Sequence, residues 1–135
     1  MLREHFPPDD PRAWLIRARS NLRHARAEED EVCYEDLCFD AQQAVEKALK
    51  GLLLHRGVQF PYTHDLAALV DLLERSGTVV PSPVRASARL TVHAVQGRYP
   101  GLGDPVARED YLAAVAAAEE VVKWVERSIR RNAAR

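Results

Sequence analysis

Apolar residues recur along the chain at spacings of three, four and seven positions, and polar residues occupy most of the positions between them. This spacing is typical of amphipathic helices, because it places the apolar side chains on one helical face. No segment of strand length alternates apolar and polar residues well enough to compete with this pattern. The pattern predicts five helices, over about residues 11–29, 31–56, 64–76, 83–97 and 105–131.

Prolines and glycines support these helix boundaries. Three pairs place a capping side chain directly before a proline, which predicts a helix start. They are Asp10-Pro11, Ser82-Pro83 and Asp104-Pro105. Gly57 and Gly77 follow apolar-periodic segments and predict helix ends. Thr63 or His64 is expected to cap the third helix, with Asp65 in its first turn.

Together these elements predict an all-α fold, an antiparallel up-and-down bundle of about five helices around one core. The length of 135 residues fits a single domain. We expect residues 11–130 to form the bundle. Residues 1–10 are predicted to be a flexible N-terminal segment, and residues 131–135 a disordered tail.

Charge and composition narrow the classes of protein. With 19 Lys and Arg against 20 Asp and Glu, the net charge of −1 provides no global field that would attract nucleic acid or a membrane. Cys33 and Cys38 lack the spacing of a zinc site, and we expect reduced thiols, no metal and no cofactor. No apolar run has the length of a membrane span, and the N-terminus lacks a signal-peptide core. These features predict a cytoplasmic protein.

The polar side of the second helix contains the first candidate site. Gln43, Glu46 and Lys50 lie at i, i+3 and i+7, and Lys47 lies beside them, so they share one face. Phe39 extends this row by one turn. Two interpretations stay open: a solvated face stabilised by a Glu46–Lys50 pair, or a surface that binds a ligand.

Two later segments allow the same two interpretations. In "GVQFPYTHDL", His64 either caps the third helix or contributes to a polar site. In "QGRYPG", Gly97 and Pro100 flank a helix end, which places Arg98 and Tyr99 at an exposed corner. Arg98 could satisfy free carbonyl groups there, or it could bind a phosphate beside the Tyr99 ring as a platform for a base.

The block "CFDAQQAVEKALKGLLLHRGVQFPYTHDLAAL", followed by "VHAVQGRYPG" and an Ala/Val-rich last helix, resembles the HEPN domain family over about residues 11–130. The resemblance implies a small helical bundle that forms a homodimer. It also implies a minimal nucleotidyltransferase as partner, in a toxin–antitoxin type of pair, and nucleotide binding. Many members of the family are metal-independent ribonucleases, which implies RNA as a further possible ligand.

The ribonuclease members carry an Arg-x4–6-His motif near the start of a late helix. At that place this chain has "GRYPGLGDP", with Arg98 and no histidine after it. Only His24 follows an arginine at the required distance, after Arg19 or Arg17, on an arginine-rich first helix. This departure from the ribonuclease motif favours a family member that binds a ligand without cleaving RNA. The alternative is an atypical endoribonuclease that uses Arg98 with His64 or His24.

Three hypotheses follow for function. The first is a dimeric module that binds a nucleotide or phosphate or docks a partner, the second is the atypical endoribonuclease, and the third is a dimerisation adaptor without a ligand. The candidate ligand-binding residues are Gln43, Glu46, Lys47, Lys50, His64, Arg98 and Tyr99. Four leftover apolar positions are expected to line the dimer contact, namely Leu53, Leu54, Val121 and Trp124.

Overall fold

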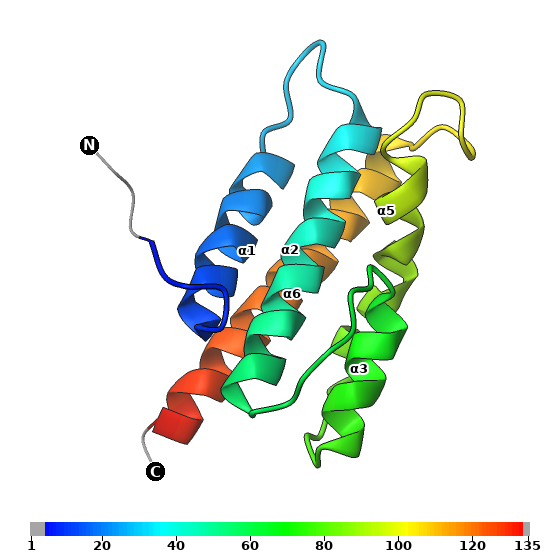
Figure 1. Cartoon of the computed structure of the whole chain (residues 1–135). Coiled ribbons are helices and arrows are strands. Elements are labelled where there is room, and N and C mark those ends of the chain that lie inside the picture. Colours follow the sequence, from blue (N-terminus) through cyan, green and yellow to red (C-terminus); the bar gives the residue numbers. More distant parts are fainter. Residues whose placement is uncertain (1–4, 134–135) are drawn as a thin grey trace.

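The computed structural model describes residues 5–133 of the chain. In this part every regular element is a helix, and the predicted all-α fold is confirmed. Long helices lie side by side, as Figure 1 shows. The elements are α1 (Pro11–Ala25), α2 (Tyr34–His55), α3 (Leu66–Arg75), α4 (Ser82–Ala86), the 3-10 helix η1 (Ser87–Val92), α5 (His93–Gln96) and α6 (Arg108–Ala133).

Helix α2 is the centre of the bundle and packs against α1 and α6. The face of α1 that meets it consists of small and branched residues at helical spacing, with Leu15, Ala18 and Leu22 buried. Alanines on both helices allow the backbones to approach closely, while each buried leucine contributes about 1.5–3 kcal/mol. More residues are buried on α2 than on any neighbouring helix, because partners cover it on most sides.

The fourth predicted helix is observed as three short consecutive elements, α4, η1 and α5. The tighter 3-10 segment begins at Ser87, whose hydroxyl donates a hydrogen bond to the carbonyl of Val84. Such bonds from serine to the preceding turn compete with regular helix geometry. The hydroxyl of Thr91 accepts a hydrogen bond from the backbone N–H of Leu66 at the start of α3. The segment therefore gives up helical regularity and gains a contact with α3.

Several predicted boundaries agree with the structure, and others differ; α1 ends at Ala25 rather than at about residue 29, and Ser82 is the first residue of α4 rather than its cap. The side chain of Asp10 caps α1, and Gly57 and Gly77 adopt positive φ after α2 and α3. The cap of α3 is Asp65, whose carboxylate accepts from Ala67 N–H, rather than Thr63 or His64. Helix α6 begins at Arg108, not at Pro105; Arg108 there forms an ion pair with Glu28 of the α1–α2 loop.

Residues 1–4 and 134–135 lie outside the described part, and α6 continues to Ala133, into the segment predicted as a tail. The expected dimer contact was wrong for Leu53, Val121 and Trp124, because the core of one chain buries all three. These positions were correctly identified as apolar, but the sequence does not show whether an apolar helix face packs against the core of its own chain or against a second copy.

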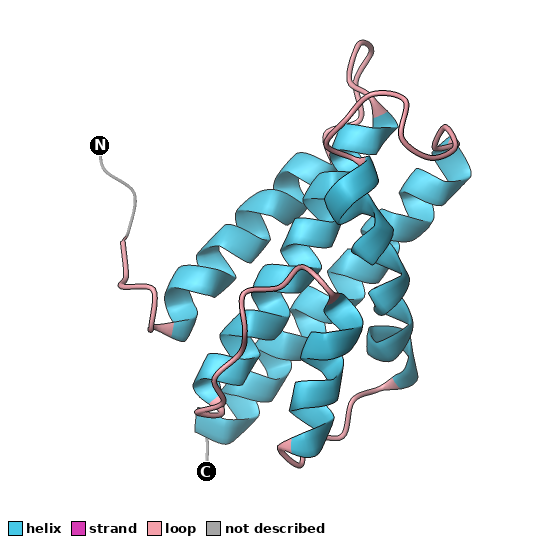
Figure 2. Ribbon diagram, turned by 45° about the vertical axis from the view of Figure 1, so that its right-hand side comes forward, coloured by secondary structure: helices cyan, strands magenta, loops and turns pink. Residues whose placement is uncertain are grey.

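The connection between α2 and α3 positions the candidate site. Figure 2 shows it as an extended loop that runs back beside the helices instead of turning tightly. Val58 and Phe60 pack against the core from this loop, and His64 reaches the middle of α2. None of the helices in the described part is long and apolar enough to span a bilayer.

Candidate functional site

The structure divides the polar residues of α2 into two rows. The first, which we call the buried row, consists of Gln42, Glu46 and Lys50 at i, i+4 and i+8. The second, which we call the half-exposed row, consists of Phe39, Gln43 and Lys47 at the same spacing. The sequence prediction had combined members of both rows into one face. The separation follows from geometry, because positions one residue apart on a helix differ by about 100°.

Glu46 organises the buried row. Its Oε1 atom lies 3.0 Å from Nε2 of Gln42 and 2.8 Å from Nδ1 of His64. Its Oε2 atom lies 3.1 Å from Nζ of Lys50. Burial alone would raise the pKa of this carboxyl group, but the bonds from its three partners outweigh burial and hold its pKa below the usual value. An ionised carboxylate cannot donate, so Nδ1 of His64 carries the hydrogen.

Lys50 is enclosed by aromatic rings. Its ammonium lies 5.7 Å from the ring centre of Trp14, 5.4 Å from that of Phe60 and 5.9 Å from that of Tyr62. Only 5% of its side chain is exposed. Cation–π contacts are strongest where the cation is desolvated, as here. Lys50 therefore fastens the loop to α2, and in this conformation its charge faces protein groups rather than solvent.

His64 connects the loop to the same carboxylate. Its ring packs edge-on against Tyr62 at 5.4 Å between centroids, and its backbone carbonyl accepts a long bond of 3.4 Å from Gln42. Its side chain remains 31% exposed. His64 can thus be reached from solvent on one edge, while its Nδ1 is committed to Glu46.

The half-exposed row has different partners. Nζ of Lys47 donates to Oδ1 of Asn21 on α1 at 2.6 Å, and Asn21 in turn donates to Asp40 at 3.1 Å. Gln43 donates to Oε1 of Gln42 at 2.7 Å. Burial, and after it the charge of Arg17, lowers the pKa of Lys47. Lys47 is a half-buried cation beside another cation, with an amide rather than a carboxylate in contact.

Arg98 covers the other end of this row. Its guanidinium carbon lies 5.2 Å from the centre of the Phe39 ring. Gly97 allows this approach, since a Cβ atom there would lie 3.1 Å from Cβ of Phe39 and 2.7 Å from the carbonyl oxygen of His93. In residues 5–133, Arg98 has no carboxylate within ion-pair distance. Its hydrogen-bond donors are available to a ligand.

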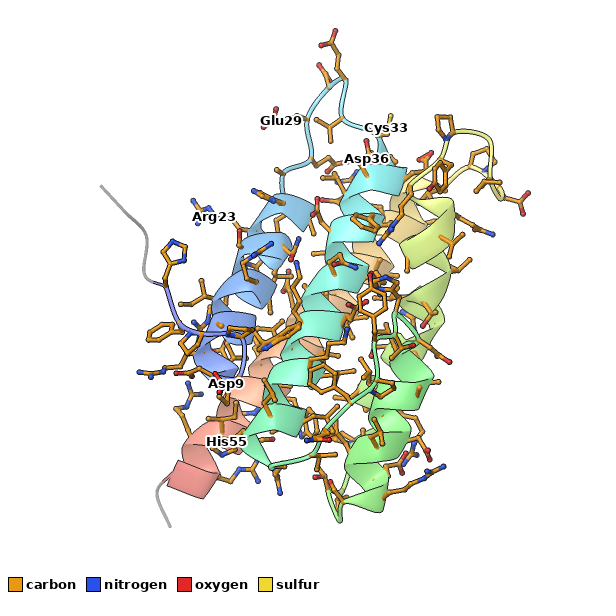
Figure 3. All side chains as sticks on the ribbon, viewed as in Figure 1. Asp9, Arg23, Glu29, Cys33, Asp36 and His55 are labelled. Atoms are coloured by element: carbon orange, nitrogen blue, oxygen red, sulfur yellow. The ribbon has the colours of Figure 1, made fainter. Side chains whose placement is uncertain are left out.

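Tyr99 lies next to Arg98 at the rim of a cleft of about 430 Å³. The cleft lies between the first turn of α2 and the loop after α5, and Cys33 and Asp36, labelled in Figure 3, also line it. Tyr99 is 61% exposed, so its ring is open to a stacking partner. Phe39, Gln43 and Lys47 are thus partly exposed along α2, and Arg98 and Tyr99 are exposed at the Phe39 end of this row; we call these five residues the accessible surface.

Chemically, the accessible surface presents cations, an amide and two aromatic rings. Within residues 5–133, the His, Cys, Asp and Glu side chains form no group of three or more that could hold a metal ion. Guanidinium and ammonium groups recognise phosphate, and aromatic rings stack on bases. The surface can therefore bind an anionic ligand that carries a planar group.

Sequence reasoning missed three residues of this region. Gln42 was not predicted as part of the polar row, although it precedes Glu46 by four residues and Lys50 by eight, the spacing that places all three on one helix face. Asn21 and Arg17 of α1 were missed because their approach to Lys47 depends on how α1 packs against α2. For those two residues, the sequence contains no local signal.

Comparison with known proteins agrees with this architecture. The family model described as HEPN domain matches residues 11–128. A solved structure titled as that of ST0689, an archaeal HEPN homologue, is 28% identical with a TM-score of 0.70, covering 89% of this chain and 98% of that one. The structure of TT1696 from Thermus thermophilus is 36% identical with a TM-score of 0.71, covering 87% and 96%. A search of curated proteins finds no match.

Proposed function

The chain belongs to the HEPN domain family, and we propose that it acts as a dimeric module that binds a nucleotide or a similar phosphate-bearing ligand along the half-exposed row of α2. One observation carries the proposal: Arg98 lies on the Phe39 ring and has no carboxylate partner among residues 5–133. An arginine that is positioned by an aromatic ring but not neutralised by an ion pair is suited to bind phosphate.

The proposal assigns a role to each predicted residue. Arg98 binds a phosphate, and Tyr99 stacks on the base. Lys47 lies two turns from Phe39, roughly 12 Å along the axis, and binds a second anionic group, while Gln43 between them contacts a polar edge. The remaining predicted residues, Glu46, Lys50 and His64, brace this helix face and the loop beside it rather than contact the ligand.

An apolar stripe supports the dimer. Val92 and Val95 lie three residues apart in the η1–α5 segment, and both side chains are substantially exposed. Exposed apolar stripes of this kind are typical of protein contacts. We propose that a second copy covers this stripe, and that the protein partner of the dimer is a minimal nucleotidyltransferase in a toxin–antitoxin type of pair. Val95→Lys should convert the dimer to a monomer in analytical ultracentrifugation.

The ligand test is a thermal-shift series with ATP, GTP and UTP on wild type and Arg98→Ala. A ligand present at 100 times its dissociation constant stabilises the folded state by about 2.7 kcal/mol. For a domain of this size, that stabilisation raises Tm by about 10 °C. Arg98→Ala should lose most of the shift, and Arg75→Ala on α3 should keep it. A wild-type protein that shows no shift with any nucleotide contradicts the proposal.

The endoribonuclease alternative uses Arg98 with His64 or His24. Glu46 engages Nδ1 of His64 and leaves Nε2, in a side chain that is 31% exposed, as the nitrogen that would act on a substrate proton, so cleavage has to be separated from binding by experiment. Metal-free incubation with labelled single-stranded RNA separates the two functions. Cleavage by wild type that is lost in Arg98→Ala would establish the alternative, and intact RNA would leave binding.

A further inference from the structure

A second polar surface lies on the outer face of α1, apart from the half-exposed row of α2. A hollow of about 700 Å³ lies between this face and the N-terminal segment around Phe6. Ala13, Ile16 and Ser20 contribute small or apolar side chains to it, and Arg17 and Arg23 lie along its length. Figure 3 shows Arg23 projecting from α1 on the side away from α2.

This hollow has an uncompensated positive charge. Helix α1 has no acidic residue, and its arginines divide into two groups. One group is neutralised, as in the pair of Arg19 with Glu126; Arg26, the C-cap residue after α1, is likewise paired with Glu119. Arg17 and Arg23 are exposed and form no ion pair in the described part of the chain.

Lys47 of the half-exposed row does not line the hollow, but it adds positive charge beside Arg17. It lies close enough to Arg17 that the two charges repel each other, and its direct contact is the Asn21 amide. Since the whole chain has a net charge of −1, this local excess comes from the placement of charges rather than from composition. A bound anion would relieve the repulsion between the two side chains.

We infer that the α1 hollow binds a linear chain of phosphate groups. Arg17 and Arg23 are six residues apart, which corresponds to roughly 9 Å of helix rise. A single phosphate does not bridge this distance, whereas two phosphates of one chain contact both guanidinium groups. The chemistry allows two sources, a single-stranded nucleic acid and inorganic polyphosphate. The apolar floor at Ala13 and Ile16, with the Phe6 ring, favours the nucleic acid, because its bases and sugars have faces to pack there.

This inference goes beyond the proposed function, because it concerns another face of the molecule and does not involve Arg98. The two can fail separately. Arg98→Ala should lose most of the nucleotide-dependent thermal shift and leave binding in the α1 hollow unchanged. Loss of both activities in Arg98→Ala would overturn the assignment of a separate site.

The test uses fluorescence anisotropy with a labelled ten-residue oligothymidylate over a series of salt concentrations. The double variant Arg17→Gln/Arg23→Gln should bind at least about 10-fold more weakly at low salt. The slope of log K against log salt should fall by about 1.4, since each phosphate contact on a single strand contributes about 0.7. Circular dichroism should show the same helix content in the variant and the wild type, because both side chains are exposed.

The matched control removes the same charge elsewhere. Arg75→Gln/Arg85→Gln changes two exposed arginines on α3 and α4 that are paired with Asp71 and Glu74. Its affinity should stay within about 2-fold of wild type, because screening weakens the effect of distant charges. An equal loss in both double variants would show a nonspecific charge effect and overturn the inference.

Competition identifies the source of the phosphates. Polyphosphate that displaces the oligothymidylate only at a much higher phosphate concentration supports a nucleic acid, whose bases add to binding. Displacement at an equal phosphate concentration supports recognition of the phosphate chain alone. Poly-glutamate that competes as well as either would overturn the inference, since the hollow would then select charge and not phosphate.

Discussion

The two rows of α2 begin within one helical turn of each other, and each contains a glutamine and a lysine. They nevertheless differ in burial and in hydrogen bonding. The buried row of Gln42, Glu46 and Lys50 is saturated by internal bonds and covered by the α2–α3 loop. The half-exposed row, with Gln43 and Lys47, keeps donors and acceptors open to solvent. The difference shows that residue type alone does not identify a binding surface. The packing of neighbouring elements decides which row is structural and which is accessible.

Removing the central carboxylate should have the largest effect. Glu46→Ala leaves the ammonium of Lys50 buried without its counter-charge, which costs about 3–5 kcal/mol. Urea unfolding followed by circular dichroism measures the loss. The matched control is Glu120→Ala, an exposed glutamate of α6, which should change stability by less than about 0.5 kcal/mol. A loss below about 1 kcal/mol in Glu46→Ala would mean that the buried row does not hold the loop.

Replacing both members of the buried ion pair sharpens this test. Glu46→Leu/Lys50→Met removes the carboxylate and the ammonium together, so no charge is left unpaired in the core. The double variant should recover much of the stability lost in Glu46→Ala, since apolar replacements of buried pairs are often neutral. His64 loses its partner in this variant, and the loop should become more sensitive to proteases.

A single methyl group tests how closely the half-exposed row is packed at its upper end. The Cβ of Gly97→Ala would lie 2.7 Å from the carbonyl oxygen of His93 and 3.1 Å from that of Glu35, both backbone atoms. The chain must shift, and we expect a loss of about 1–3 kcal/mol in urea unfolding. The shift also moves Arg98 from the Phe39 ring, so ligand-dependent thermal shifts should decrease. Unchanged stability together with unchanged shifts would contradict the described approach of α5 to α2.

Adjacent glutamines give the most direct comparison of the rows. Gln42→Ala removes a fully buried amide that bonds to Glu46, and should cost about 1–3 kcal/mol. Gln43→Ala should change stability by less than about 0.5 kcal/mol and weaken ligand binding instead. Denaturation and thermal-shift measurements on both variants check this crossover. Equal effects on both measurements would remove the distinction between the rows.

Much of the fold follows from the sequence because helical period, caps and glycines are local signals. Asp10 and Gly57 marked real helix ends for that reason. The start of α6 was misplaced because Asp104-Pro105 is an equally good turn signal, and the Arg108–Glu28 pair that marks the observed start joins distant segments. The 3-10 geometry of Ser87–Val92 depends on contacts with α3, and no sequence pattern marks it.

The site was only partly predictable for a related reason. Arg98 and Tyr99 were correctly expected to be exposed, because the glycine and proline that flank them end the helix there. Glu46 and Lys50 were placed on a ligand-binding face because the sequence does not show that three aromatic rings from α1 and the loop surround Lys50. Burial of a charge is a tertiary property, and helical spacing alone leaves it open.

The smallest expected effect is the dependence of stability on pH through Glu46. Its pKa is lowered in the folded protein, so the folded state binds the proton more weakly than the unfolded state. The contribution of the carboxylate is therefore fully present above its unfolded pKa, near 4.5, and is lost as pH falls through the lower folded pKa. Urea unfolding between pH 6 and pH 3 should show a steeper loss for wild type than for Glu46→Gln, whose amide does not titrate. Parallel curves for the two proteins would show that the buried carboxylate gains no net stabilisation from its partners. The acid sensitivity would then come from surface ion pairs such as that of Glu28 with Arg108. In that pair, Arg108 lowers the pKa of Glu28.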